Sequence, residues 1–288
     1  MIRSDDFISF DGTRIRFHVI GDGPNPIVLA NGHGGTVDVW APVFQCLPTH
    51  CRVITWDYRC QHGSETTKNT PTIADHYGDL GALVQHLSLQ RFGLAGWSLG
   101  VQVALQGYRQ HREQVGAIGL IHGAHDRLLS RVFDGRLNGF GKHAARWASA
   151  VEPAFKHIYK APLRGLLKRD FSQHLLHRLG FVYDNHDHLQ KMVQAFIELD
   201  WSTYIAVASN ADEHVTEHWL HEIDIPVFLT VGERDWMTPP SQILPAFSQL
   251  KTAHLQQFEG SHFPILEEPG RVAEILGRCA ELSAAERS

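Results

Sequence analysis

The sequence of 288 residues lacks the features of several large protein classes. Its four cysteines form no Cys-x-x-Cys pair and its first residues do not resemble a signal peptide, so we expect free thiols and a cytoplasmic location. No apolar run approaches the length of a membrane-spanning helix. The formal net charge of −5 gives no electrostatic reason to expect a nucleic acid or an anionic membrane as partner.

Metal-binding signatures are absent as well, although the chain contains 20 histidines. Residues 184–188, Asp-Asn-His-Asp-His, contain several possible ligands, but the chain has no His-Glu-x-x-His motif and no cysteine pair to accompany them. We interpret this stretch as a solvated loop. The sequence therefore predicts no metal site and no cofactor.

Most of the chain alternates between strand-like and helix-like patterns. Hydrophobic residues make up 43% of the sequence, enough for one large domain with a substantial core. Helical patterns cover residues 74–89, 101–108 and 271–282. Strand patterns cover residues 7–10, 14–20, 27–30, 53–57, 91–95, 117–122, 226–231 and 253–258. This alternation predicts a mainly parallel sheet with helices on both faces.

Between residues 127 and 222 the pattern changes. Aromatic and apolar residues recur at helical spacing, as at Phe140, Ala144 and Trp147, and no strand-like run is present. Strand patterns return at Pro226. We therefore predict a core of residues 1–126 and 223–288, with residues 127–222 inserted as a separate helical unit.

The most informative motif is Gly-Trp-Ser-Leu-Gly at residues 96–100. It lies between a predicted strand and a predicted helix, which is the setting of a nucleophile elbow. In such a turn the serine backbone is strained, and the two glycines leave room for neighbouring backbone. The motif predicts that Ser98 is a nucleophile.

A serine nucleophile needs a base, and the base needs an acid to orient it. Asp235 follows the predicted strand at residues 226–231, and His262 follows the one at residues 253–258. Glu233 is the rival acid, but the Gly-x-x-Asp arrangement favours Asp235. We predict that Ser98, His262 and Asp235 form a catalytic triad.

The order serine, aspartate, histidine, each after a strand, resembles the α/β-hydrolase superfamily. Within it the chain is similar to serine esterases, lipases and cofactor-free haloperoxidases. The resemblance implies an eight-stranded, mainly parallel sheet flanked by helices, and a helical cap formed by residues 127–222. It also identifies residues 27–35 as a strand and oxyanion loop, in which the backbone N–H groups of His33 and Leu99 would stabilise an oxyanion.

The chain departs from the family pattern at two places. Asn31 stands where relatives usually have the histidine of a His-Gly pair, which affects the packing of the oxyanion loop more than its backbone donor. Residues 60–64, Cys-Gln-His-Gly-Ser, replace a turn that is usually glycine-rich.

Four residues are candidates for the substrate pocket. His122 follows a strand whose loop lies near the pocket in this family, Trp97 and Trp236 adjoin the predicted nucleophile and acid, and Trp147 lies in the predicted cap. For Trp97 a buried core position is the alternative. The apolar content of the cap favours a substrate with an apolar acyl or alcohol group.

The resemblance implies hydrolysis of a carboxylic ester or a related acyl compound through an acyl-enzyme. The same triad supports perhydrolysis, thioester cleavage and carbon–carbon hydrolysis in related proteins, and these stay open. A non-catalytic small-molecule receptor of the same fold is a further alternative, against which the three predicted triad residues together argue.

Overall fold

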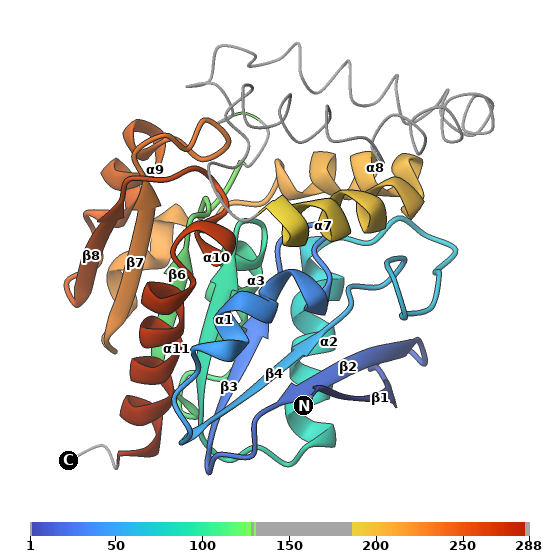
Figure 1. The fold of residues 1–288 in the computed structure, drawn as a ribbon, viewed down its shortest axis with the longest axis horizontal. Coiled ribbons are helices and arrows are strands. Elements are labelled where there is room, and N and C mark those ends of the chain that lie inside the picture. The colour runs from blue at the N-terminus through green and yellow to red at the C-terminus, as the bar shows by residue number, and fades with distance from the viewer. Residues whose placement is uncertain (1, 128–129, 131–185, 286–288) are drawn as a thin grey trace.

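The computed structural model describes residues 2–127, 130 and 186–285. At its centre is an eight-stranded sheet with the order β1-β2-β4-β3-β5-β6-β7-β8 (Figure 1). β2 is antiparallel to both β1 and β4, and all other neighbouring pairs are parallel. The strands are β1 (Ile2–Ile8), β2 (Arg14–Ile20), β3 (Asn25–Ala30), β4 (Cys51–Trp56), β5 (Phe92–Trp97), β6 (Val115–Ile121), β7 (Val227–Gly232) and β8 (Ala253–Phe258). The predicted mainly parallel sheet is confirmed.

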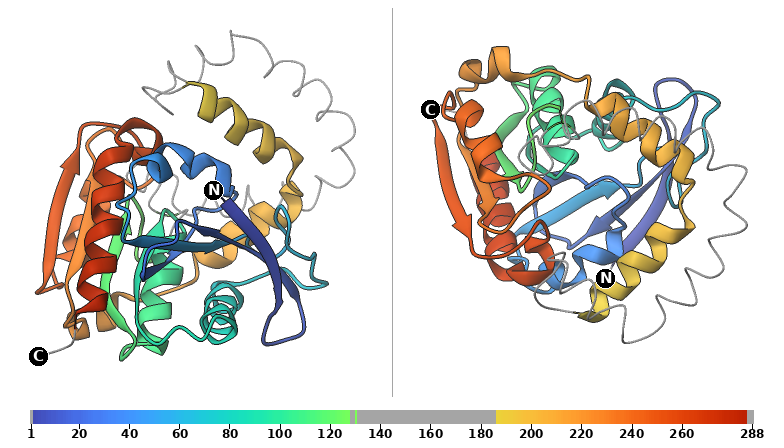
Figure 2. Two further views of the ribbon diagram at one scale, coloured as in Figure 1. Left: turned by 60° about the horizontal axis from the view of Figure 1, so that its bottom comes forward. Right: turned by 90° about the horizontal axis from the view of Figure 1, so that it is seen from above.

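Helices cover both faces of the sheet (Figure 1, Figure 2). α2 (Ile73–His86) and α3 (Gly100–Gln110) contact each other on one face, and α1 (Ala41–Gln45) contacts α11 (Pro269–Ala284) on the other. Two hydrophobic clusters result. Leu94 of β5 packs with α2 and α3, whereas its neighbour Ala95 packs with α11, because successive strand side chains point to opposite faces.

The central strands are buried on both faces, which explains their nearly unbroken apolar sequences. Every residue of β5, β6 and β7 is buried. The edge strand β1 differs, since only Phe7 is buried, and it begins at Ile2 rather than at the predicted residue 7. The first residues of β1 were missed because they are mostly polar, and an edge strand with little buried surface has no apolar pattern to recognise.

The sequence patterns also did not predict several short helices. η1 (Val37–Trp40), α9 (Pro240–Phe247) and α10 (Pro264–Glu267) have four to eight residues, too few to establish a helical period. A proline lies in the first turn of α1, α9, α10 and α11, where it loses no hydrogen bond.

The described part of residues 127–222 is helical. It consists of α7 (His186–Glu198), α8 (Trp201–Ala211) and η3 (Glu217–Glu222), and no strand occurs among the described residues of this range. α7 contacts η1, which follows the carboxyl end of β3 (Figure 1). α7 begins at His186, within the stretch interpreted as a loop. Within the described residues, no helix combines the length and apolar character needed to span a membrane. The proposed domain boundaries stay a prediction.

Candidate active site

The turn after β5 holds Ser98 in a strained conformation. Its φ is 56°, in the left-handed region that costs a non-glycine residue about 1–3 kcal/mol. Close backbone packing makes glycine necessary on both sides. A Cβ on Gly96 would lie 2.1 Å from the carbonyl oxygen of Gly100, and one on Gly100 would lie 2.1 Å from that of Ala30. The turn thus presents the Ser98 side chain at the carboxyl end of β5.

Two further loops bring a histidine and an aspartate to Ser98. His262 Nε2 lies 2.8 Å from Ser98 Oγ, and His262 Nδ1 lies 2.8 Å from Asp235 Oδ2. Asp235 follows β7 and His262 follows β8, so the parallel sheet aligns both loops at one edge with the elbow. Side-chain exposure is 3% for His262 and 0% for Asp235, which shields their contact from water. Glu233, the rival acid, is exposed.

Asp235 is fixed by the loop that carries it. Its Oδ1 accepts hydrogen bonds from the backbone N–H groups of Met237 and Thr238, and its Oδ2 accepts one from the Thr238 hydroxyl at 2.7 Å. Burial alone would raise the pKa of Asp235. The nearby His262 and these donors outweigh it, so the pKa is lowered and the carboxylate is ionised at neutral pH.

The ionised carboxylate determines the tautomer of His262. Since the Asp235 carboxylate can only accept, His262 Nδ1 carries the hydrogen and Nε2 has a lone pair facing Ser98 Oγ. The Ser98 hydroxyl then donates to Nε2. This arrangement can remove a proton from Ser98 and can stabilise the imidazolium that results.

The backbone N–H groups of His33 and Leu99 have no hydrogen-bond partner among the described residues. Leu99 is the residue at the N-terminus of α3, where the helix dipole favours negative charge. His33 lies in the loop after β3, and β3 is the neighbour of β5. Both N–H groups are thus available to an anionic oxygen, and their role as oxyanion donors belongs to the proposal below.

Asn31 stabilises the inside of the loop after β3. Its Oδ1 accepts hydrogen bonds from the backbone N–H of Gly32 at 2.8 Å and from Trp40 Nε1 at 2.9 Å. Its backbone oxygen accepts a third from the Tyr58 hydroxyl at 2.7 Å. The residue that departs from the family pattern therefore acts as an internal brace for the loop.

Residues 60–64 make a strained turn. Cys60 has a φ of 65° and His62 a φ of 47°, although neither is glycine. Gln61 between them is 5% exposed and reaches the loop that contains His33. The sequence showed that this turn departs from the family pattern but not where its side chains lie.

The predicted pocket residues are placed differently from one another. Trp97 is 3% exposed, packs in the core against Trp40 and donates from Nε1 to the backbone oxygen of His262, so it lies beneath the site. Trp236 is partly buried and lies beside Asp235 in the same loop. Trp147 lies outside the described residues.

His122 lies behind the triad. It is 1% exposed, its Nδ1 is 2.8 Å from Thr230 Oγ1, and its ring packs edge-on against Phe258. Burial lowers the pKa of His122 to about 3, with the charge of Asp235 opposing this shift, so the ring is neutral at neutral pH. His122 is therefore a buried residue that packs behind the triad, against Thr230 and Phe258.

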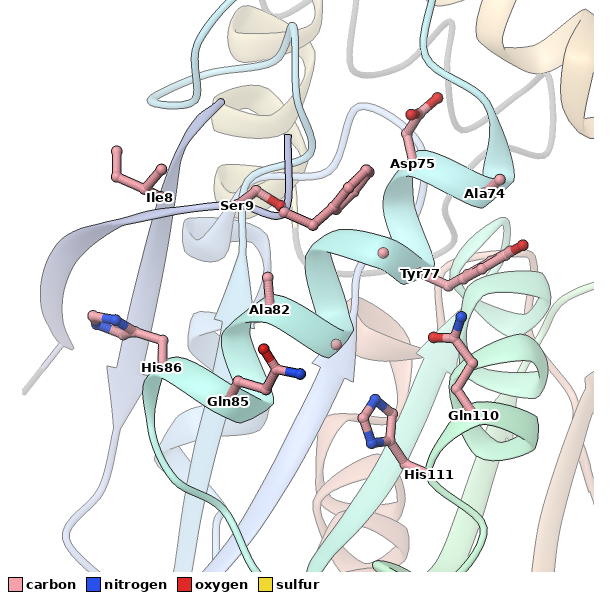
Figure 3. Close-up of a pocket in the computed structure, with 13 residues that line it drawn as sticks. Ile8, Ser9, Ala74, Asp75, Tyr77, Ala82, Gln85, His86, Gln110 and His111 are labelled. Carbon is pink, nitrogen blue, oxygen red and sulfur yellow. The ribbon is translucent and has the colours of Figure 1, made fainter. Parts of the chain in front are cut away.

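A separate cavity of about 900 Å³ lies between the β1–β2 turn, α2 and the end of α3 (Figure 3). Its walls include Tyr77, Gln85, His86 and His111, and it shares no residue with the Ser98 arrangement. Among the residues that the structure describes, no group of three or more histidines, cysteines or carboxylates is placed to hold a metal ion.

Comparisons with known proteins identify the fold family of the chain. A family model described as the alpha/beta hydrolase fold matches residues 25–269. A protein of Caulobacter sp. (strain K31) named carbamate hydrolase RutD is 26% identical over 232 residues, 78% of this chain and 80% of its own length.

Solved structures show the same fold. The enol-lactonase from Burkholderia xenovorans LB400 superposes with a TM-score of 0.77 at 20% identity, covering 96% of this chain and 99% of that one. An esterase (EaEST) from Exiguobacterium antarcticum gives a TM-score of 0.76 at 21% identity, with 96% and 98% covered. The chain belongs to the α/β-hydrolase fold family.

Proposed function

We propose that the protein is a serine hydrolase that cleaves a carboxylic ester or a related acyl compound. The observation that carries this proposal is the pair of 2.8 Å contacts that join Ser98 to His262 and His262 to Asp235. Membership of a hydrolase family supports it, as do the names of the similar proteins.

In the first half of the reaction, His262 Nε2 takes the proton of Ser98 as Oγ attacks the substrate carbonyl carbon. The carbonyl oxygen becomes an oxyanion, and the N–H groups of His33 and Leu99 donate to it. Preorganised donors of this kind are each worth roughly 3–4 kcal/mol in the transition state. The intermediate collapses, His262 gives its proton to the departing alcohol, and an acyl group remains on Ser98.

In the second half, His262 takes a proton from a water molecule, whose oxygen attacks the acyl carbon. A second oxyanion forms at the same two donors. Its collapse releases the carboxylic acid and returns the proton from His262 to Ser98 Oγ. Every step uses residues of this chain, and none calls for a metal or cofactor.

A carbamate is the second candidate substrate. The similar protein from Caulobacter is named a carbamate hydrolase, and a carbamate presents the same kind of carbonyl to Ser98. The nitrogen next to that carbonyl lowers its electrophilicity, so the two substrate classes place different demands on the same residues. The apolar acyl group and the cytoplasmic location expected from the sequence stay predictions.

The test pairs a covalent label with matched substrates. A fluorophosphonate probe should label the protein at neutral pH, and peptide mass analysis should locate the adduct on Ser98. A series of p-nitrophenyl esters of increasing acyl length, beside the p-nitrophenyl carbamate, would then rank the substrate classes. Absence of both labelling and ester hydrolysis in folded protein would refute the proposal, whereas a faster carbamate would redirect it to the second candidate.

A further inference from the structure

The ring of His33 connects the loop after β3 to the helix α8. His33 Nε2 lies 2.8 Å from the backbone oxygen of Tyr204, and the two rings stack with centroids 3.9 Å apart. A carbonyl oxygen can only accept, so Nε2 carries the hydrogen and Nδ1 must accept. Gln61 Nε2 meets that requirement by donating to His33 Nδ1 at 3.0 Å.

The turn at residues 60–64 also holds both polar groups of Gly34. The Gly34 N–H donates to Gln61 Oε1 at 3.0 Å, and the Gly34 oxygen lies 3.2 Å from His62 Nε2, which donates to it. Gly34 has a φ of 77°, where a Cβ would lie 2.9 Å from the Tyr204 ring. The two side chains thereby fix the orientation of the peptide units that follow His33.

The turn that brings Gln61 and His62 to His33 and Gly34 has a conformational cost. Cys60 and His62, which flank Gln61, both have positive φ values without being glycine. Strain at non-glycine residues persists only where the surroundings enforce it, and it concentrates at functional sites. Here the strained turn directs two consecutive side chains, Gln61 and His62, to the loop that contains one of the two available N–H groups.

We propose that Gln61 and His62 are positioning residues that hold the His33 N–H in place to receive the oxyanion. The proposal rests on the proposed hydrolase function. Gln61 acts through the amide of Gly34 and the ring of His33, and His62 acts through the oxygen of Gly34. Neither residue needs to contact the substrate, and their effect is on the rate of the chemical step.

The main test is Gln61→Met, which keeps the length of the side chain but removes both hydrogen bonds. With p-nitrophenyl butyrate as substrate, kcat per active site should fall about tenfold to a hundredfold while KM stays within about threefold, because a displaced oxyanion donor weakens the transition state. Active sites are counted by the p-nitrophenol released from diethyl p-nitrophenyl phosphate, which separates slow enzyme from unfolded enzyme.

Gln106→Met is the matched control. Gln106 in α3 also makes a glutamine–histidine hydrogen bond, but to His214 at 3.2 Å and not to His33. Its kcat should stay within about twofold of the wild type. If Gln61→Met does not fold, His62→Gly takes its place. That change relieves the positive φ yet removes the bond to Gly34, and should lower kcat several-fold with little change in Tm.

The outcomes distinguish the two proposals. If the wild type neither hydrolyses the ester nor reacts with the phosphate, the proposed function fails and the positioning role falls with it. If the wild type does both, and Gln61→Met and His62→Gly keep kcat within about threefold, only the positioning role is refuted. A fall in active-site count at unchanged kcat refutes it as well, since it would show a purely structural effect.

Discussion

Two regions of this molecule place a serine, a histidine and an aspartate in a hydrogen-bonded row. In the first, Ser98 and Asp235 lie on either side of His262. In the second, Ser4 Oγ lies 2.8 Å from Nδ1 of His18, whose Nε2 lies 3.3 Å from Asp57 Oδ1. The residue types and the order of contacts are the same, with the two ring nitrogens exchanged.

The backbone around each serine separates the two arrangements. Ser4 is an exposed residue of the regular edge strand β1 and pairs across to His18 in β2. Ser98 lies in a strained turn at the start of a helix, next to Leu99, whose N–H has no partner among the described residues. Ser4 lies within an extended strand and not at the start of a helix, so no helix dipole favours an anionic oxygen beside it. Contact distances alone therefore do not define a catalytic serine.

The aspartates of the two rows differ in their other hydrogen-bond partners. Apart from His262, the hydrogen-bond donors to Asp235 come from its own loop, so this carboxylate connects His262 to no other element. Asp57 Oδ2 accepts the N–H of Gly63 at 2.9 Å, so this carboxylate connects His18 in β2 to the strained turn at residues 60–64. We therefore interpret the row of Ser4, His18 and Asp57 as a structural tie at the edge of the sheet.

The largest expected effect is that of Ser98→Ala. Removing the nucleophile of a triad lowers kcat by up to about a millionfold, while the alanine fits the turn and keeps the fold. Ester hydrolysis and fluorophosphonate labelling, measured beside a thermal melt, check this. If purified Ser98→Ala protein keeps more than a few per cent of the activity, Ser98 is not the nucleophile.

The second comparison exchanges the aspartates for asparagines. Asp235→Asn should lower kcat about ten-thousandfold, because an amide can hold His262 in the wrong tautomer. Asp57→Asn, the matched control, should leave kcat within a few-fold and affect the melting temperature instead. Equal losses of kcat in the two variants would show that the second row also serves the reaction.

The first row could be predicted from the sequence because each of its members has a recognisable pattern in the residues around it. Ser98 has glycines on both sides, and Asp235 and His262 each follow an apolar strand, so residue order and parallel strands suffice to bring them together. The second row has no such signal. Ser4 meets His18 through the register of an antiparallel edge pair, and a polar edge strand leaves little pattern to read.

The contacts around the first row could not be predicted from the sequence, for a related reason. The bonds of Gln61 with His33 and Gly34 depend on two backbone conformations that residue type disfavours, at Cys60 and His62. Propensity predicts the common conformation and fails where the fold enforces a rare one. The burial of Trp97 depends in turn on how the loop after β3 covers the end of β5.

A third way to separate the regions is the response of stability to acid. His122, behind the first row, has a pKa lowered by burial to about 3, whereas an unfolded histidine titrates near 6.5. Between these pH values the unfolded chain binds more protons, so the free energy of unfolding falls as the pH falls. From pH 7.5 to pH 5 this one group should cost on the order of 2 kcal/mol.

Denaturant titrations of His122→Asn at the two pH values test this, since asparagine tolerates the positive φ of 39° at this position. The variant should lose less stability on acidification than the wild type. His254→Asn replaces an exposed histidine of β8 and should follow the wild type. A His122→Asn variant with the same acid sensitivity as the wild type would contradict a neutral, buried His122.

The smallest expected effect is that of Ser4→Ala, and it tests the comparison most directly. The change removes the hydroxyl from His18 Nδ1 but leaves the strand pairing of β1 intact, and alanine fits an exposed strand position. Loss of one hydrogen bond at a partly exposed site should cost no more than about 1 kcal/mol of stability. Esterase activity and fluorophosphonate labelling of Ser98 should match the wild type. A fluorophosphonate adduct found on Ser4 in wild-type protein, or a tenfold loss of kcat in Ser4→Ala, would show that a hydrogen-bonded row is enough for reactivity without the strained turn and its donors.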